Sequence, residues 1–103
     1  MLFPVDGNTV WLPLEHPLAD DGFYPCVALI ECAAQLAGRA VTAPLGNAGM
    51  LVEVGEFIAE VDAVAVGRTL TYVVSHERTM GQLWRFRVQL VGVLSVAVTI
   101  RVG

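Results

Sequence analysis

The sequence predicts an α+β fold in which an antiparallel sheet is wrapped round one long central apolar helix. Two patterns indicate this fold. Residues 27–43 are rich in alanine and apolar nearly all round the helical circumference, whereas residues 51–102 repeat apolar side chains with a period of two. A helix that is apolar on all sides is expected to be buried on all sides. Because 103 residues cannot close two separate cores, we expect one domain, residues 1–103.

The first half of the chain is expected to hold a short strand, a loop and the helix. Residues 9–14 are typical of an edge strand, because their proline lacks the N–H that a central strand needs. Residues 15–24 are rich in turn formers and are predicted to be a loop. Pro25 suits the first position of a helix, so we expect the helix to run from Cys26 until Pro44 stops it.

The second half is predicted to be antiparallel sheet after a loop at residues 45–49. Its strands are expected at residues 51–66, 68–75, 83–91 and 95–102, joined by hairpin-length connections at 75–82 and 92–94. One face of residues 84–90 carries Trp84, Phe86, Val88 and Leu90, while Arg85, Arg87 and Gln89 share the other. This alternation predicts a strand that is buried on one side only.

The composition indicates a protein that associates with copies of itself. Apolar residues make up 55% of the chain and charged residues only 16%, against about 25% charged in an average domain. No stretch is long and apolar enough for a membrane helix, and no secretory signal is visible. We therefore expect no membrane association, and a homodimer, or a larger homo-oligomer of dimers, that shares a sheet edge. A net charge of −4 argues against nucleic-acid binding.

The two cysteines, Cys26 and Cys32, are expected to remain reduced. Their spacing places them on different faces of the predicted helix, where disulfide geometry is impossible within one chain. Reduced, buried thiols are typical of a cytoplasmic protein. No second Cys/His pair completes a tetrahedral set of ligands, so we expect neither a metal nor another cofactor.

Glu31 and His16 are the residues that suggest chemistry. Glu31 lies within the apolar helix, with no Lys or Arg three or four positions away on either side. An uncompensated buried carboxylate tends to hold its proton and is then able to act as a general acid. The alternative is that Glu31 reaches solvent or a distant arginine. Histidine is the side chain best suited to proton transfer near neutral pH, although a single loop histidine is more often merely solvated.

The start of the predicted helix and His76 each have a functional and a plainer interpretation. The first N–H groups of the helix, at Cys26 and Val27, lack partners within the helix and are able to polarise a carbonyl oxygen. The Cys26 thiol is a much weaker candidate for a nucleophile, because the sequence offers it no base partner. His76 is expected on the surface, at the end of a strand.

In their order along the chain, these residues resemble a known family. His16-Pro17-Leu18, Gly22, Pro25 and the run Leu29-Ile30-Glu31-x-x-Ala34-Gln35 are similar to the signature of the 3-hydroxyacyl-acyl-carrier-protein dehydratases. The resemblance covers residues 15–39 and extends to dehydratase-like proteins of aryl polyene and polyketide-type pathways. It implies the hotdog fold, in which a sheet wraps round a central helix.

The resemblance also implies a reaction. His16 would abstract the α-proton of a 3-hydroxyacyl thioester, and Glu31 of another subunit would protonate the departing hydroxyl, leaving a trans-2-enoyl thioester. The N–H of Cys26 or Val27 would hold the thioester carbonyl. Further substrate-binding positions implied by the resemblance are Gly22, Pro25 and Gln35, with the acyl group carried on acyl carrier protein or CoA. A hotdog thioesterase and an inactive acyl-binding subunit remain open as alternatives, since one fold hosts many functions.

Overall fold

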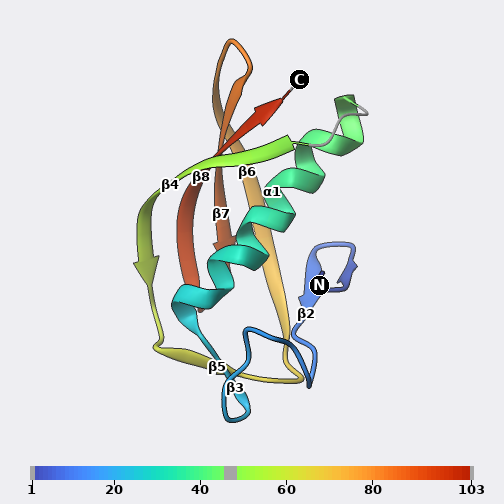
Figure 1. Cartoon of the computed structure of the whole chain (residues 1–103), viewed down its shortest axis with the longest axis vertical. Helices are drawn as coiled ribbons and strands as arrows, with labels where there is room; N and C mark the ends of the chain where they lie inside the picture. The colour runs from blue at the N-terminus through green and yellow to red at the C-terminus, as the bar shows by residue number, and fades with distance from the viewer. Residues whose placement is uncertain (1, 46–48, 103) are drawn as a thin grey trace.

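A six-stranded antiparallel sheet and one α-helix make up most of the computed structural model, which describes residues 2–45 and 49–102 (Figure 1). The strands of this sheet lie in the order β1-β2-β6-β7-β8-β4. They are β1 (Val5–Asp6), β2 (Thr9–Trp11), β6 (Thr69–Met80), β7 (Leu83–Leu90), β8 (Leu94–Val102) and β4 (Gly49–Ala59). Two short strands, β3 (Phe23–Pro25) and β5 (Ala63–Ala65), form a separate antiparallel pair. A 3-10 turn, η1 (Cys26–Leu29), leads from β3 into the helix α1 (Ile30–Leu45).

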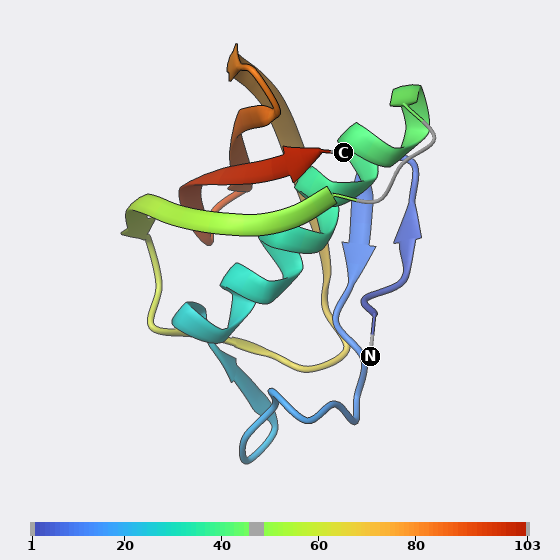
Figure 2. The same cartoon turned by 45° about the horizontal axis from the view of Figure 1, so that its top comes forward.

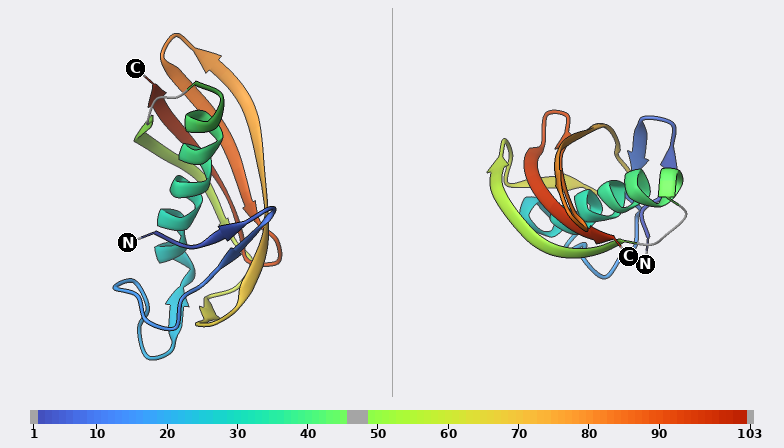
Figure 3. Two further views of the ribbon diagram at one scale, coloured as in Figure 1. Left: turned by 90° about the vertical axis from the view of Figure 1, so that its right-hand side faces the viewer. Right: turned by 90° about the horizontal axis from the view of Figure 1, so that it is seen from above.

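The helix α1 lies against the concave face of the curved sheet (Figure 3). Its contact with the sheet is one apolar stripe, because the buried positions recur every three or four residues, as they do on one side of a helix. These positions are Leu29 of η1 and Cys32, Ala33, Leu36, Ala37 and Val41 of α1. The facing side of the sheet supplies Phe86, Val88, Val96, Val98 and Ile100 to the same core.

The expected fold, a hotdog with a sheet wrapped round one long central apolar helix, is wrong. Residues 2–45 and 49–102 are mostly antiparallel sheet, and the one α-helix among them is only 16 residues long. The first four residues of the predicted helix form η1 instead, and Glu31 and Arg39 are exposed on α1. The prediction failed because alanine residues lie on several faces of the helix and make it look apolar all round. A helix with Ala at positions 33, 34, 37 and 40 reads as uniformly apolar even though only one stripe is covered.

The period-two pattern predicted the later strands well. Phe86, Val88 and Leu90 of β7 are buried and Gln89 is exposed, which confirms the one-sided strand. The hairpin expected at 75–82 is confirmed, but its turn is shorter than expected. Strand β6 continues to Met80, and Gly81, with φ of 59°, turns the chain directly into β7. Residues 46–48 of the expected 45–49 loop lie outside the described residues. The predicted edge strand at 9–14 is not at the edge, because β1 pairs with β2 on its outer side.

At the opposite edge, β4 pairs with β8 and has no other strand partner within residues 2–45 and 49–102 (Figure 2). This edge is long and apolar. Six large hydrophobic side chains along it are exposed, namely those of Met50, Leu51, Val52, Val54, Phe57 and Ile58. We call these six residues the β4 edge. In contrast, the edge strand β1 has only two residues.

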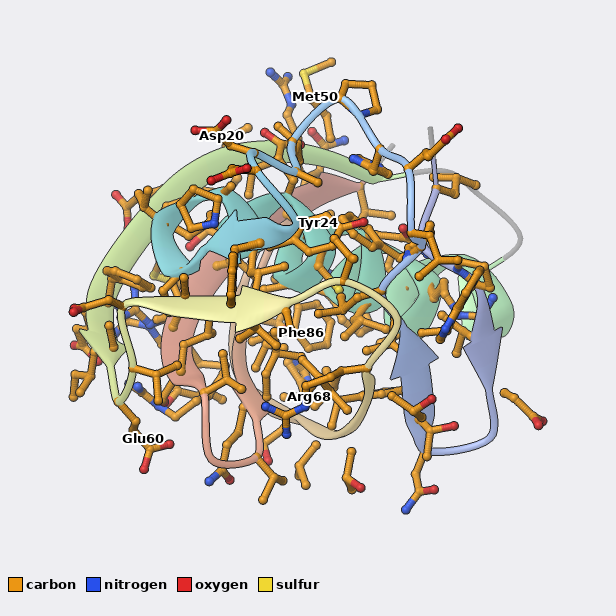
Figure 4. The ribbon with its side chains drawn as sticks, turned by 90° about the horizontal axis from the view of Figure 1, so that it is seen from below. Asp20, Tyr24, Met50, Glu60, Arg68 and Phe86 are labelled. Atoms are coloured by element: carbon orange, nitrogen blue, oxygen red, sulfur yellow. The ribbon has the colours of Figure 1, made fainter. Side chains whose placement is uncertain are left out.

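The side chains of the core and those of the periphery lie in different surroundings. Tyr24 and Phe86 lie in the crowded interior beside the helix, whereas Met50 and Glu60 project at the periphery (Figure 4). Within the part of the chain that the structure describes, no helix is both long and apolar enough to cross a membrane.

Candidate functional site

A pocket of about 470 Å³ opens where the N-terminal segment, the loop after β2 and the first turns of α1 meet. Three of the side chains that line it are polar, those of His16, Glu31 and Gln35. The rest of the lining is apolar and comes from Leu2, Phe3, Pro17, Leu18 and Ala34. The pocket therefore gathers His16, Glu31 and Gln35 from segments far apart in the chain.

A tight turn fixes the position of His16. Pro17 stands at the second position of a β-turn, where its fixed φ is favourable, and the Ala19 N–H donates to the His16 carbonyl oxygen at 3.0 Å. In the same turn the Leu18 N–H donates to Nδ1 of the His16 ring at 3.1 Å. Since Nδ1 accepts this hydrogen bond, the neutral ring carries its proton on Nε2.

Aromatic rings hold the His16 imidazole in place. The Phe3 ring stacks on it with a centroid separation of 4.5 Å and an interplanar angle of 19°. The Tyr24 ring is tilted against both, with centroids 5.8 Å from each. Tyr24 is itself anchored, because its hydroxyl donates to the Pro13 carbonyl oxygen at 2.6 Å and its ring is buried. Burial, and next the nearby Cys32, raises the pKa of the Tyr24 hydroxyl.

Glu31 does not lie where the sequence placed it. Its side chain is exposed in the first turn of α1 rather than sealed in an apolar core. The burial on which we based a protonated carboxylic acid is therefore absent. A carboxylate in the first turn is also favoured by the helix dipole, which gives Glu31 a structural role besides any chemical one.

Gln35 lies one helical turn after Glu31 and makes two hydrogen bonds to the backbone of Phe3. The Phe3 N–H donates to Oε1 of Gln35 at 2.7 Å, and Nε2 of Gln35 donates to the Phe3 carbonyl oxygen at 2.7 Å. The resemblance implied a substrate-binding role for Gln35. In this structure, both polar ends of its amide contact the chain itself.

The other predicted substrate-binding residues do not line this pocket. Gly22 forms a two-residue hairpin turn with Asp21, and both have positive φ, 51° for Asp21 and 78° for Gly22. Pro25 lies in β3. The Cys26 N–H, expected to hold a thioester carbonyl, donates to the Asp62 carbonyl oxygen at 2.8 Å. Val27 is 63% exposed and outside the pocket.

Both thiols are buried and neither takes part in a disulfide, which confirms that Cys26 and Cys32 do not pair. Burial raises the pKa of the Cys32 thiol to about 12. Burial also raises the pKa of Cys26, with a further contribution from Asp62. Because the thiolate is the reactive form, these shifts argue against either cysteine as a nucleophile.

A second group of charged residues lies on the outer face of the sheet. Arg85 of β7 forms ion pairs with three glutamates. The nitrogen–oxygen distances are 3.5 Å to Glu53, 3.3 Å to Glu56 and 3.2 Å to Glu77. Arg87 also pairs with Glu56 and Glu77. These contacts tie β4 and β6 to β7, with three carboxylates arranged around two guanidinium groups. Within the described residues, no group of three or more His, Cys, Asp or Glu side chains is placed to hold a metal ion.

Sequence reasoning missed the part that Phe3 plays. It found His16, Glu31 and Gln35, but no pattern in the sequence connects Phe3 with a helix that begins at Ile30. Comparison of the chain with models of known protein families gives no match, and comparison with curated proteins gives none. The site must therefore be interpreted from its own geometry.

Proposed function

We propose that this protein dehydrates 3-hydroxyacyl thioesters to trans-2-enoyl thioesters in the pocket that holds His16 and Glu31. One observation carries the proposal: the two residues capable of proton chemistry in the resemblance to the dehydratases line the same pocket. The apolar remainder of the lining suits an acyl chain, because burying its methylene groups is favourable. The elimination needs proton transfer and no redox step, so the chain's own side chains suffice.

The hydrogen bond to Nδ1 supports a division of roles between the two residues. The lone pair of Nδ1 is occupied by the Leu18 N–H, so the neutral His16 ring presents an Nε2–H donor rather than a base. In our proposal this N–H binds the thioester carbonyl oxygen and stabilises the negative charge that develops there. This differs from the resemblance, which implied that His16 itself abstracts the proton.

In this proposal Glu31 carries out both proton transfers, first from the α-carbon and then to the leaving hydroxide. Its carboxylate removes the α-proton, the electron pair of that C–H bond forms the new double bond, and the C–O bond to the 3-hydroxyl breaks. The same carboxyl group returns the proton to the departing hydroxide, so that water leaves and the carboxylate is regenerated. The exposure of Glu31 on the pocket wall gives substrate access to it. Since His16 and Glu31 line one pocket of one chain, the proposed reaction does not require the two subunits that the resemblance implied.

The reaction is tested by incubating the purified protein with a 3-hydroxyacyl thioester and, separately, with the 2-enoyl thioester. Enoyl absorbance and free thiol are followed in parallel. Interconversion of the two thioesters, absent in Glu31→Gln, supports the proposal. Release of thiol without enoyl formation overturns it in favour of a thioesterase, and the absence of both reactions overturns it in favour of an acyl-binding subunit. Running both acyl carrier protein and CoA thioesters identifies the carrier.

We also propose that the protein forms a homodimer through the β4 edge. An exposed, long, apolar edge strand is a template for pairing with another strand. β4 extends over 11 residues, and its pairing with β8 has two register shifts, between Leu51 and Glu53 and between Gly55 and Ile58. Its two glutamates, Glu53 and Glu56, are paired with Arg85 and Arg87 of the same chain, which lowers their repulsion toward a second strand. Pairing with a second copy covers six exposed apolar side chains and fits the low charge of the whole sequence.

A further inference from the structure

The N-terminal segment forms one wall of the pocket rather than a tail beside it. Leu2 and Phe3 both line the pocket, and the Phe3 side chain is buried although it lies close to the start of the chain. We call residues 2–4 the N-terminal strap. Before β1 begins at Val5, its backbone is held at two places. Phe3 makes the pair of hydrogen bonds with the Gln35 side chain, and the Pro4 carbonyl oxygen accepts from the Trp11 N–H at 2.9 Å.

These contacts connect the helix to the imidazole. Gln35 is fixed on α1, one turn from Glu31, and it grips the backbone of Phe3 at both its N–H and its carbonyl. The Phe3 ring in turn stacks on His16. A side chain on the same helix as Glu31 is thereby linked, through Phe3, to the His16 ring, which lies on a separate loop.

We propose that Gln35 is a positioning residue that orients His16 relative to Glu31 by holding the N-terminal strap. The effect of this positioning on catalysis rests on the proposed dehydration. The positioning of His16 by Gln35 does not depend on that reaction. An amide suits this role because it supplies one donor and one acceptor at the same time. A carboxylate at position 35 accepts from the Phe3 N–H but repels the Phe3 carbonyl oxygen, and a thioether makes neither hydrogen bond strongly.

The positioning is tested by NMR of the two histidine rings, of which the chain has only His16 and His76. Stacking on Phe3 shifts the ring-proton resonances of His16 away from those of a solvated histidine. In Gln35→Met and in Gln35→Glu we expect these resonances to move toward the solvated values. His76, which is distant in sequence from His16 and stacks on Trp84, serves as the internal control. We expect its resonances to remain in place. Gln89→Met, which removes an exposed glutamine amide from β7, leaves both histidines unchanged.

Phe3→Leu separates positioning from general loss of folding. It keeps the backbone groups that Gln35 contacts but removes the stacked ring, so it should move the His16 resonances as Gln35→Met does. With an active protein, both variants should lower kcat roughly tenfold or more, with a smaller effect on KM, because misplaced catalytic groups slow the chemical step. His16 resonances that stay in place in Gln35→Met or in Phe3→Leu overturn the proposal. If they move and the wild-type protein shows no dehydration, the positioning stands and the proposed reaction fails.

Discussion

At the scale of single residues, the hydrogen bond from the Leu18 N–H to Nδ1 decides what His16 can do. A ring whose Nδ1 is an acceptor donates through Nε2 while it is neutral. His16 is therefore suited to hold an oxygen atom rather than to remove a proton from carbon.

Two substitutions at His16 distinguish these roles. His16→Ala removes the donor, and we expect a loss of roughly 10²-fold or more in kcat for dehydration. His16→Gln keeps an N–H donor near the position of Nε2 and should retain at least about ten times the activity of His16→Ala, since a carboxamide cannot act as a base but can bind an oxyanion. Steady-state kinetics on both variants measures this difference. Equal activity of the two variants would contradict the donor role and support His16 as the base.

The Cys32 thiol has a consequence for stability at alkaline pH. Its pKa is raised from 9.0 to about 12 in the folded protein because it is buried. Below about pH 9 the thiol is protonated in the folded and unfolded chains alike, so it makes no pH-dependent contribution. Between pH 9 and 12 the unfolded chain loses this proton while the folded chain keeps it. The free energy of unfolding therefore falls, by about 1.4 kcal/mol per pH unit for this group.

The measurement is urea unfolding at a series of pH values from about 8 to about 11, on the wild type and on Cys32→Ala. The variant is expected to be less stable at neutral pH, because it leaves a cavity. Its stability should nevertheless fall less steeply above pH 9 than that of the wild type. Two curves that remain parallel across this range would show that Cys32 ionises equally in both states.

The site residues show what a sequence can predict at this scale. Local residue patterns indicate two parts of the site. One is the turn formed by His16 and Pro17, and the other is the helix that carries Glu31 and Gln35. The contact of Gln35 with Phe3 is not local, because the two residues are 32 positions apart. The exposure of Glu31 was also missed, because it depends on which stripe of the helix the sheet covers.

At the scale of elements, the strands were easier to predict than the helix for a physical reason. Each strand of β6–β8 has neighbours on both sides and one covered face, so burial alternates and the pattern shows it. Small alanine side chains give α1 no comparable contrast between its faces. The sequence predicts only a loop around the hairpin turn Asp21-Gly22, because the strand that follows this turn pairs with β5, which is distant in sequence.

Two glycines on neighbouring elements should respond to the same substitution with opposite signs. Gly22 has φ of 78°, a conformation that strains any residue with a Cβ atom, so Gly22→Ala should lower the free energy of unfolding by about 1 kcal/mol. Gly38 lies within α1, and a Cβ atom built on it meets nothing within 4 Å. Since alanine has the higher helix propensity, Gly38→Ala should raise stability by up to about 1 kcal/mol.

Thermal unfolding followed by circular dichroism measures both changes, with an expected shift of about 4–8 °C per kcal/mol for a domain of this size. Each variant serves as the control for the other, because both add the same methyl group. A Gly22→Ala protein as stable as the wild type would show that the turn adopts another conformation. A destabilised Gly38→Ala protein would show that this face of α1 packs against something, such as a second copy.

At the scale of the whole molecule, the distribution of exposed apolar side chains points to the β4 edge as the surface for a second copy. A two-fold axis brings the same strand of each copy together in antiparallel pairing, so the surface needs to complement only itself. Ile58 of β4 is 62% exposed. Ile58→Lys places a charge where the second strand would lie, and we expect a dimer in the wild type and a monomer in this variant.

The matched control is Val91→Lys, which adds the same charge at another exposed apolar position, 47% exposed in the turn between β7 and β8. This variant should remain a dimer. Sedimentation equilibrium measures the mass of all three proteins, and circular dichroism verifies that each is folded. A monomeric wild type would overturn the dimer, and a dimeric Ile58→Lys would move the interface away from β4. Because His16 and Glu31 line a pocket within one chain, a folded monomeric Ile58→Lys protein should keep the dehydratase activity that we propose for this pocket. That result would separate the role of the edge from that of the pocket.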